Sequence, residues 1–466
     1  MRHYIGLLEQ DLRQKRVDTP VCYDPQDLIN PHLLICGMSG TGKSYQALRF
    51  LASAAQSGIE IDVFDAHDEL DQIPGAKACL FSQATQYGFN PLVLDTDPHT
   101  GGVDRQVSFF LGLIKSITPQ FGIKQEAALR YLLVDTYAQA GISQGNRASW
   151  QKRIISESTR TTLIERQDYA ALRDYYPTLE DLRAYTRRKV IALTLGSDNP
   201  CVTAFDSLTK MKRKLDALEK KLGKAVLDED IAKLREQIED QKQVCKESYG
   251  DFIDSMETGR EIDDILKYDS VDVLTSVMQR LSVLAATGIL SANEPPFGSS
   301  KVRVHQIKSC THEQQVLYVK LRLQSIFDKL KRLGPVKPGE VRQIVFLDEA
   351  HKYFNNEPDD IINIIAREAR KFGLGLWCAS QQPTAFPESF LTNVGATMLL
   401  GIHTSYWKRA ASMFRVSEAE LRSVKPKEIM AIKMLREGQV DPPFTNVVLP
   451  GESSVGRRAE AYNKNS

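Results

Sequence analysis

The segment from Gly37 to Ser44 reads Gly-Met-Ser-Gly-Thr-Gly-Lys-Ser and fits the pattern G-x-x-x-x-G-K-S/T. A short apolar run at 32–36 precedes it, and a stretch with helical spacing of apolar residues, 44–56, follows it. Between a buried strand and a helix, such a loop curls its backbone N–H groups around a phosphate at the helix N-terminus. A second apolar strand at 59–64 completes a strand–loop–helix–strand unit, which predicts a parallel α/β sheet.

This phosphate loop predicts ATP and Mg²⁺ as ligands. Lys43 is expected to reach the β- and γ-phosphates, and Ser44 to ligate Mg²⁺. The alternative is a glycine-rich turn without a ligand, which the flanking strand and helix make the less favoured interpretation. The predicted nucleotide-binding residues are Gly37, Met38, Ser39, Gly40, Thr41, Gly42, Lys43, Ser44 and Tyr45.

Two later strands end in polar residues suited to the same site. The apolar strand 343–347 delivers Asp348 and Glu349 at its C-terminal end, where ligands of parallel sheets bind. We expect Asp348 to hold Mg²⁺ through water and Glu349 to act as general base on the attacking water. Gln381 follows a strand at 374–379, where its amide can detect the γ-phosphate. Taken alone, each is also compatible with an ordinary polar strand end, and the phosphate loop is what makes them its expected partners.

Length and composition exclude several classes of protein. The chain has 466 residues, which predicts two to three domains. Its 60 basic and 59 acidic residues give a net charge of +1, which excludes a histone-like polycation. Seven scattered cysteines without C-x-x-C spacing favour neither a disulfide framework nor a zinc site, and suit a reducing cytosol. With no targeting signal and no apolar run of about 18 residues, we expect a cytoplasmic protein without a membrane span.

The sequence pattern along the chain changes from one that predicts alternating strands and helices to one that predicts helices alone, and then back again. Apolar residues spaced 3-4-3-4 on both sides of Gly223 predict an antiparallel helical hairpin at about 205–250, whose second arm starts at Asp228. The predicted parts are an N-terminal segment 1–30, a first core part 31–103, an inserted helical domain 104–264, a second core part 265–450 and a polar tail 451–466.

The first arm of the predicted hairpin is strongly basic. Such a cluster can contact nucleic-acid phosphates without sequence preference. It is more commonly a solvated helix face, here able to pair with the acidic second arm, and both interpretations stay open. A separate basic patch stands at 187–189. The basic residues of the arm are Lys210, Lys212, Arg213, Lys214, Lys220, Lys221 and Lys224.

Five short blocks carry a resemblance to a known family. In chain order, and covering roughly 32–100 and 265–450, they resemble the motifs of the HerA/FtsK superfamily of RecA-like motor ATPases, most closely HerA-type DNA helicase/translocases. The blocks are Asp65-Ala-His-Asp-Glu69, Asn90-Pro-Leu92, Leu347-Asp-Glu-Ala-His351, the segment from Ala366 to Gly373, and Ala379-Ser-Gln-Gln-Pro383.

The resemblance implies an α/β fold with a RecA-like P-loop NTPase core, a predominantly parallel sheet and an inserted helical domain. It also implies a ring, expected to be a hexamer, that couples ATP hydrolysis to translocation of double-stranded DNA. By position, Asp65 and Glu69 become additional active-site acids, and Arg370 an arginine acting on the γ-phosphate of the neighbouring subunit. From the residues alone, a surface charge on a helix rich in Arg and Glu is the favoured interpretation of Arg370, and the resemblance reverses it. No catalytic role is assigned to His67 or His351.

Some features depart from the family pattern. Only 36 residues precede the phosphate loop, which we expect to be too few for the family's N-terminal β-barrel. Whether a nuclease or another effector protein docks here, as the family's barrel would allow, therefore stays open. Gln382 replaces the usual arginine and Ala369 the usual glycine. Two alternatives therefore remain: an ATPase of a conjugative or type IV secretion machine, and a nucleotide-dependent ring scaffold that recruits an effector in an antiviral defence complex.

Overall fold

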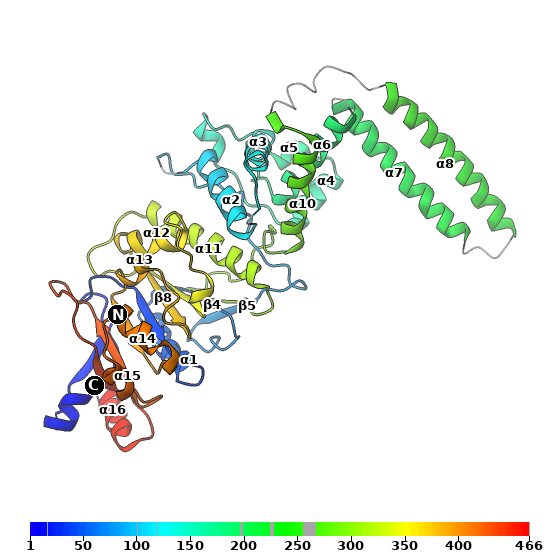
Figure 1. Ribbon diagram of the computed structural model, residues 1–466. Helices are drawn as coiled ribbons and strands as arrows, with labels where there is room; N and C mark the ends of the chain where they lie inside the picture. The colour runs from blue at the N-terminus through cyan, green and yellow to red at the C-terminus, as the bar shows by residue number, and fades with distance from the viewer. Residues whose placement is uncertain are drawn as a thin grey trace. The chain divides into compact units, whose positions relative to one another are not determined.

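The computed structural model describes the chain except residues 16, 100, 119, 196–198, 224–227, 255–266 and 466. It divides into two compact units, one formed by residues 1–89 with 293–466 and the other by residues 90–292. Figure 1 shows the strands in the first unit, while the second is built from helices.

The first unit is organised around one mixed sheet. Within the described residues the sheet has eleven strands in the order β2-β1-β11-β10-β9-β3-β8-β7-β4-β6-β5. Their bounds are β1 (His3–Leu8), β2 (Pro20–Tyr23), β3 (Leu33–Cys36), β4 (Glu60–Asp65), β5 (Ala76–Leu80), β6 (Val302–Gln306), β7 (Gln343–Leu347), β8 (Leu374–Ser380), β9 (Ala396–Leu399), β10 (Ile429–Met434) and β11 (Thr445–Val448).

The segment of the sheet from β9 to β5 is entirely parallel. Its central strands are apolar and buried on both faces, as expected for parallel strands covered by helices, and every residue of β3 and β7 is buried. The expected α/β fold with a predominantly parallel sheet is confirmed. On one side of the sheet, Phe50 packs edge-on against Tyr23 and Trp377, with ring centroids 5.4 and 5.8 Å apart.

Helices and short helical turns connect these strands. The described helices of the first unit are α1 (Lys43–Gln56), α11 (His312–Arg332), α12 (Ile361–Glu368), α13 (Glu388–Leu391), α14 (Trp407–Phe414), α15 (Glu418–Ser423) and α16 (Ser454–Asn465). The short turns are η1 (Asp11–Lys15), η3 (Ala350–Lys352), η4 (Ala369–Phe372) and η5 (Thr404–Tyr406).

The two chain ends differ from their expected description as an N-terminal segment and a polar tail. Residues 1–30 supply β1 and β2, which extend the sheet through antiparallel pairing of β1 with β11. Residues 454–465 form α16, held to β1 where the Tyr4 hydroxyl donates to the Ala459 carbonyl at 3.0 Å and the Tyr4 ring stacks on Tyr462. The partners of β1, namely β11 and α16, lie more than 400 residues away, so the local sequence at the two chain ends carries little signal of this pairing.

The second unit is helical. Its described helices are α2 (Val103–Ile117), α3 (Ile123–Gln139), α4 (Glu157–Glu165), α5 (Tyr169–Leu172), α6 (Leu179–Leu195), α7 (Asn199–Leu222), α8 (Asp228–Asp254) and α10 (Val271–Ala286), with the turn η2 (Arg147–Trp150). Helices α7 and α8 lie side by side, as Figure 1 shows. Of the basic residues of the first arm, Lys224 lies outside the described residues.

The helical unit begins before residue 104 and continues past 264, the expected limits of the insertion. Asn90 belongs to it because its side-chain amide donates to the Pro177 carbonyl at 2.9 Å. Helix α10 belongs to it because it packs on α3 and α6. The expected limits were set where the helical sequence pattern begins and ends. The unit is larger because it also includes extended segments that pack on its helices.

A fully buried carboxylate, Asp62, lies at the centre of a polar network on the first unit's sheet. It accepts hydrogen bonds from His305 (2.9 Å), Arg303 (2.6 Å) and Gln343 (2.7 Å), and Arg322 lies 3.3 Å away. Burial alone would raise the pKa of Asp62, but its cationic and hydrogen-bonding partners outweigh burial and hold that pKa well below its usual range.

Candidate nucleotide-binding site

The strand order places the three predicted motifs together at the C-terminal ends of the central strands. Strands β3, β8 and β7 are neighbours and parallel, so their C-terminal ends lie together. The phosphate loop follows β3, Gln381 follows β8, and Asp348 follows β7. The Ser380 carbonyl at the end of β8 accepts a hydrogen bond of 3.1 Å from the Gly37 amide, which joins the first two segments directly.

The phosphate loop has the backbone shape that its glycines permit. Gly42 caps α1 with φ 99°, a left-handed conformation in which a side chain would be strained. A Cβ on Gly37 would lie 2.5 Å from the Thr41 hydroxyl oxygen, so only glycine fits there. The Thr41 hydroxyl donates to the Met38 carbonyl at 2.8 Å and the Lys43 ammonium donates to the same carbonyl at 3.1 Å. The loop is therefore closed around its own polar groups.

Lys43 points into a site that also contains carboxylates. Burial lowers the pKa of Lys43, and the negative charges of Glu349, Asp348 and Glu69 act in the opposite direction. An ammonium held near several carboxylates stays charged while its water is removed. That combination suits a cation that must bind a phosphate in a partly dry site.

Glu349 is held in a strained and buried position. Its backbone φ is 46°, which is uncommon for any residue with a side chain, and only 4% of the residue is exposed. The Gln381 side-chain amide donates to Glu349 Oε1 at 2.7 Å, and His351 Nδ1 lies 3.3 Å from Glu349 Oε2. Strain of this kind persists only where the surroundings fix it, and it gathers at functional sites.

His351 connects Glu349 to the end of β8. Its Nδ1 is also 3.0 Å from the Ser380 hydroxyl, and burial lowers the pKa of His351. Sequence reasoning assigned this histidine no role. Its position two residues after Glu349 was the only local signal, since the contact with Ser380 joins residues on different strands.

Glu69 and Asp65 occupy different places. The Ser44 hydroxyl donates to Glu69 Oε2 at 2.9 Å, so Glu69 lies beside the phosphate loop. Asp65 is fully buried and accepts backbone N–H bonds from His67, Asp68 and Leu70 at 3.0, 2.9 and 2.8 Å. Burial raises the pKa of Asp65, and these N–H groups act in the opposite direction. Both its oxygens are thus used to shape the turn that carries Glu69.

The donor groups beside the loop fit Mg²⁺ at Ser44 and Asp348. A hydroxyl and carboxylates are the hard oxygen ligands that this ion prefers. His67, Asp348 and Glu349 also approach one another within 4.8 Å, but His67 Nδ1 lies 2.7 Å from Asp348 Oδ2. This hydrogen bond raises the pKa of His67 and favours the imidazolium, which cannot ligate a metal. We therefore interpret the trio as an ion pair between His67 and Asp348, with Glu349 beside it.

Arg370 does not join this site within one chain. It lies exposed on η4, just before β8 begins, whereas Gln381 follows the end of the same strand. The two residues thus lie at opposite ends of β8. Within one chain, Arg370 therefore lies away from the phosphate loop, which is at the other end of the parallel strands.

The arrangement of strand ends defines the class of protein. A phosphate loop between central parallel strands, with acids delivered by a strand two positions away, is the architecture of a RecA-like P-loop NTPase. Residues 5–319 match the family described as "Helicase HerA, central domain", and residues 305–417 match "Helicase HerA-like C-terminal". The chain belongs to the HerA helicase family of motor ATPases.

Individual proteins extend this likeness. A curated protein of Methanocaldococcus jannaschii, "Probable helicase MJECL08", is 30% identical over 128 residues, and the match covers 24% of this chain and 24% of that protein. VirB4 of Thermoanaerobacter pseudethanolicus shares the fold, with a TM-score of 0.60, 15% identity and 97% of each chain covered. The bacterial conjugative coupling protein TrwB gives a TM-score of 0.48 at 12% identity, with 97% of this chain and 94% of that chain covered. Among the described helices, none combines the length and apolar character needed to cross a bilayer.

Proposed function

We propose that this protein is a ring-forming, ATP-hydrolysing DNA translocase of the HerA type, assembled as a hexamer. The observation that carries the proposal is the hydrogen bond between Gln381 and Glu349, at 2.7 Å, beside a phosphate loop with a half-buried Lys43. Hydrolysis of a nucleoside triphosphate needs a general base, a group that positions it and a cation that binds the phosphates. Glu349, Gln381 and Lys43 can supply these three parts at the C-terminal ends of neighbouring strands.

The chain's residues divide the work of hydrolysis. Lys43 and the backbone N–H groups of the phosphate loop bind and orient the phosphates. Ser44 and Asp348 would hold Mg²⁺, which would supply positive charge to neutralise the phosphates. Glu349 accepts a proton from the attacking water, and Gln381 holds that carboxylate in place.

Assembly into a ring follows from the position of Arg370. Among the site residues described above, Lys43 is the cation and none is an arginine, while Arg370 is exposed at the opposite ends of the parallel strands. Arginines that stabilise charge on the γ-phosphate are often supplied by a neighbour. Head-to-tail contacts that bring Arg370 of one subunit to the nucleotide of the next close into a ring.

Duplex DNA is the proposed substrate of movement, on the basis of family membership. A motor that moves over any sequence should contact phosphates rather than base edges, so binding should depend steeply on salt and little on sequence. The decisive experiment compares the ATPase rate with and without duplex DNA, using Glu349→Gln as the inactive control. Stimulation supports the translocase. An unchanged rate, with no duplex binding at low salt in the presence of ATP, would overturn it.

A conjugative or secretion ATPase remains the second candidate, because the fold is shared with VirB4 along the full chain. That likeness concerns the fold alone. An ATPase rate that is the same with and without duplex DNA, together with an intact ring, would favour this candidate.

A further inference from the structure

A turn close to the phosphate loop carries a lysine in a strained conformation. Residues 425–428 form a β-turn closed by the hydrogen bond from the Glu428 amide to the Lys425 carbonyl, 3.0 Å, with Pro426 as its second residue. Lys427, the third residue, has φ 65°. Proline followed by a positive φ defines a type II turn, in which the third position favours glycine or asparagine. Glycine would adopt this backbone conformation with less strain than Lys427 does.

The turn is fixed against the loop rather than free on the surface. It precedes β10, which runs antiparallel to β9, so the start of β10 lies at the edge where β9 and β3 end. Pro426 Cγ lies 3.5 Å from the point where Gly401 would carry a Cβ. The Gly401 carbonyl in turn accepts the Met38 amide of the phosphate loop at 2.8 Å. A chain of direct contacts thus joins the turn to the loop.

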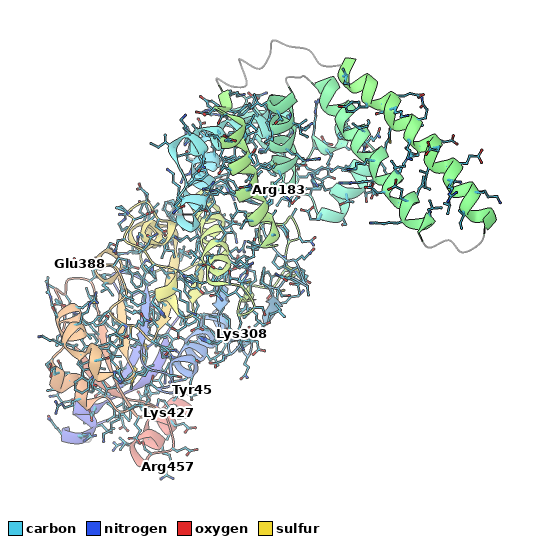
Figure 2. All side chains as sticks on the ribbon, turned by 45° about the vertical axis from the view of Figure 1, so that its right-hand side comes forward. Tyr45, Arg183, Lys308, Glu388, Lys427 and Arg457 are labelled. Atoms are coloured by element: carbon cyan, nitrogen blue, oxygen red, sulfur yellow. The ribbon has the colours of Figure 1, made fainter. Side chains whose placement is uncertain are left out.

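The side chain of Lys427 lies beside the N-cap residue of α1. Its Cγ lies 3.8 Å from the point where Gly42 would carry a Cβ, and Gly42 is the N-cap of α1. The ammonium is three bonds beyond Cγ on a flexible stem. Lys427 is exposed and has no ion pair or side-chain hydrogen bond with the described part of the chain. Figure 2 labels Lys427 and Tyr45, the third residue of α1, both on the sheet-bearing unit.

We propose that Lys427 is a second phosphate-binding cation, supplied by the same subunit as Lys43, that binds the β-phosphate of the bound nucleotide. This inference rests on the proposed function and adds a residue to it. Lys43 faces the carboxylates Asp348 and Glu349, on the side of the γ-phosphate, whereas Lys427 lies by Gly42. The N-terminus of α1 is where the loop's N–H groups meet the β-phosphate. Backbone strain kept at a residue beside a ligand site is a recognised sign of function.

The turn offers unusually sharp variants for a test. Lys427→Gly removes the ammonium and at the same time relieves the backbone strain, so it should keep or raise the melting temperature without nucleotide. Lys427→Arg keeps the charge. Lys425→Gln removes a positive charge from the same turn, two residues away, and is the matched control.

The measurement is equilibrium binding of ADP and ATP with Mg²⁺ by titration calorimetry, on the full chain. Loss of one partly exposed charged hydrogen bond should weaken binding about tenfold. We expect this loss for both nucleotides in Lys427→Gly, recovery in Lys427→Arg, and wild-type affinity in Lys425→Gln.

Three outcomes overturn the inference and leave the proposed function intact. One is wild-type ADP affinity in Lys427→Gly, and another is an equal loss in Lys425→Gln. The third is unchanged nucleotide affinity together with weakened binding of a duplex oligonucleotide, which would assign Lys427 to DNA. Absence of ATP binding by the wild-type chain, or unchanged binding in Lys43→Ala, would instead refute the proposed nucleotide site.

Discussion

Replacing Asp62 by asparagine tests how the buried network holds the sheet. The change keeps shape and removes one charge between Arg303 and Arg322, whose side chains are 14% and 19% exposed. Gln343 and His305 are the other close partners of Asp62, at 2.7 and 2.9 Å. Burial lowers the pKa of His305 to about 4, so it is neutral near pH 7 and donates its Nε2 proton to Asp62, while Nδ1 accepts from Tyr318. An asparagine amide cannot satisfy all these donors.

The size of the effect follows from burial. Removing one partner of a buried ion pair costs about 3–5 kcal/mol, because the other charge stays buried without compensation. Both guanidinium groups keep some water and Arg303 keeps Glu60 at 3.1 Å, so we expect about 3 kcal/mol. That is roughly a hundredfold in the folding equilibrium.

Glu60→Gln is the matched control on the same strand. Glu60 also contacts Arg303, but its side chain is 33% exposed and its other partner, Lys329, is 45% exposed. Ion pairs open to solvent contribute about 0–1 kcal/mol. We therefore expect the control to lower the free energy of unfolding by less than a third of the Asp62→Asn effect.

The assay is chemical unfolding followed by tryptophan fluorescence in a Trp150→Phe background. Trp150 belongs to the helical unit, so its removal leaves the signal to Trp377 and Trp407 of the sheet-bearing unit. Because the folded pKa of Asp62 is depressed, its contribution is present above the unfolded value of about 3.9 and is lost only as pH falls through the folded value. Equal effects of Asp62→Asn and Glu60→Gln at pH 7 would refute the reasoning.

Three predictions concern the site. Glu349→Gln should bind ATP normally and lower kcat about 10²–10⁴-fold, because the general base is lost; turnover near the wild-type rate would show that another group is the base. His351→Ala should lower kcat about tenfold with little change in KM, because His351 positions Glu349 rather than the nucleotide; a rise in KM alone would contradict this. Mixing Arg370→Ala with Lys43→Ala subunits should restore some ATPase activity, since some interfaces then pair an intact Arg370 with an intact Lys43; mixtures as inactive as their components would contradict action in trans.

The sequence could predict features that are encoded locally. The phosphate loop was recognisable because its glycines, Lys43 and Ser44 are contiguous and lie between a strand and a helix. The strand 343–347 was located to the residue because it is an uninterrupted apolar run buried on both faces. The sequence places Gln381 after a strand and predicts that its amide detects the γ-phosphate, whereas its 2.7 Å hydrogen bond to Glu349 joins the ends of two different strands and has no local signal.

Contacts between distant segments could not be predicted in the same way. Nothing near Asp65 in the sequence reveals that three backbone N–H groups of the following turn bind it. The strands β1, β2 and β11 are short and gain stability from pairing with one another, so local pattern carries little information about them. Lys427 was missed because its approach to Gly42 depends on the antiparallel pairing of β10 with β9.

The end of β8 connects the phosphate loop to Glu349, the proposed general base. The Ser380 carbonyl holds the Gly37 amide of the phosphate loop, and its hydroxyl lies 3.0 Å from His351, which contacts Glu349. The next residue, Gln381, binds the other oxygen of that carboxylate. A shift of the loop would therefore reach both carboxylate oxygens of Glu349 through two adjacent residues, Ser380 and Gln381.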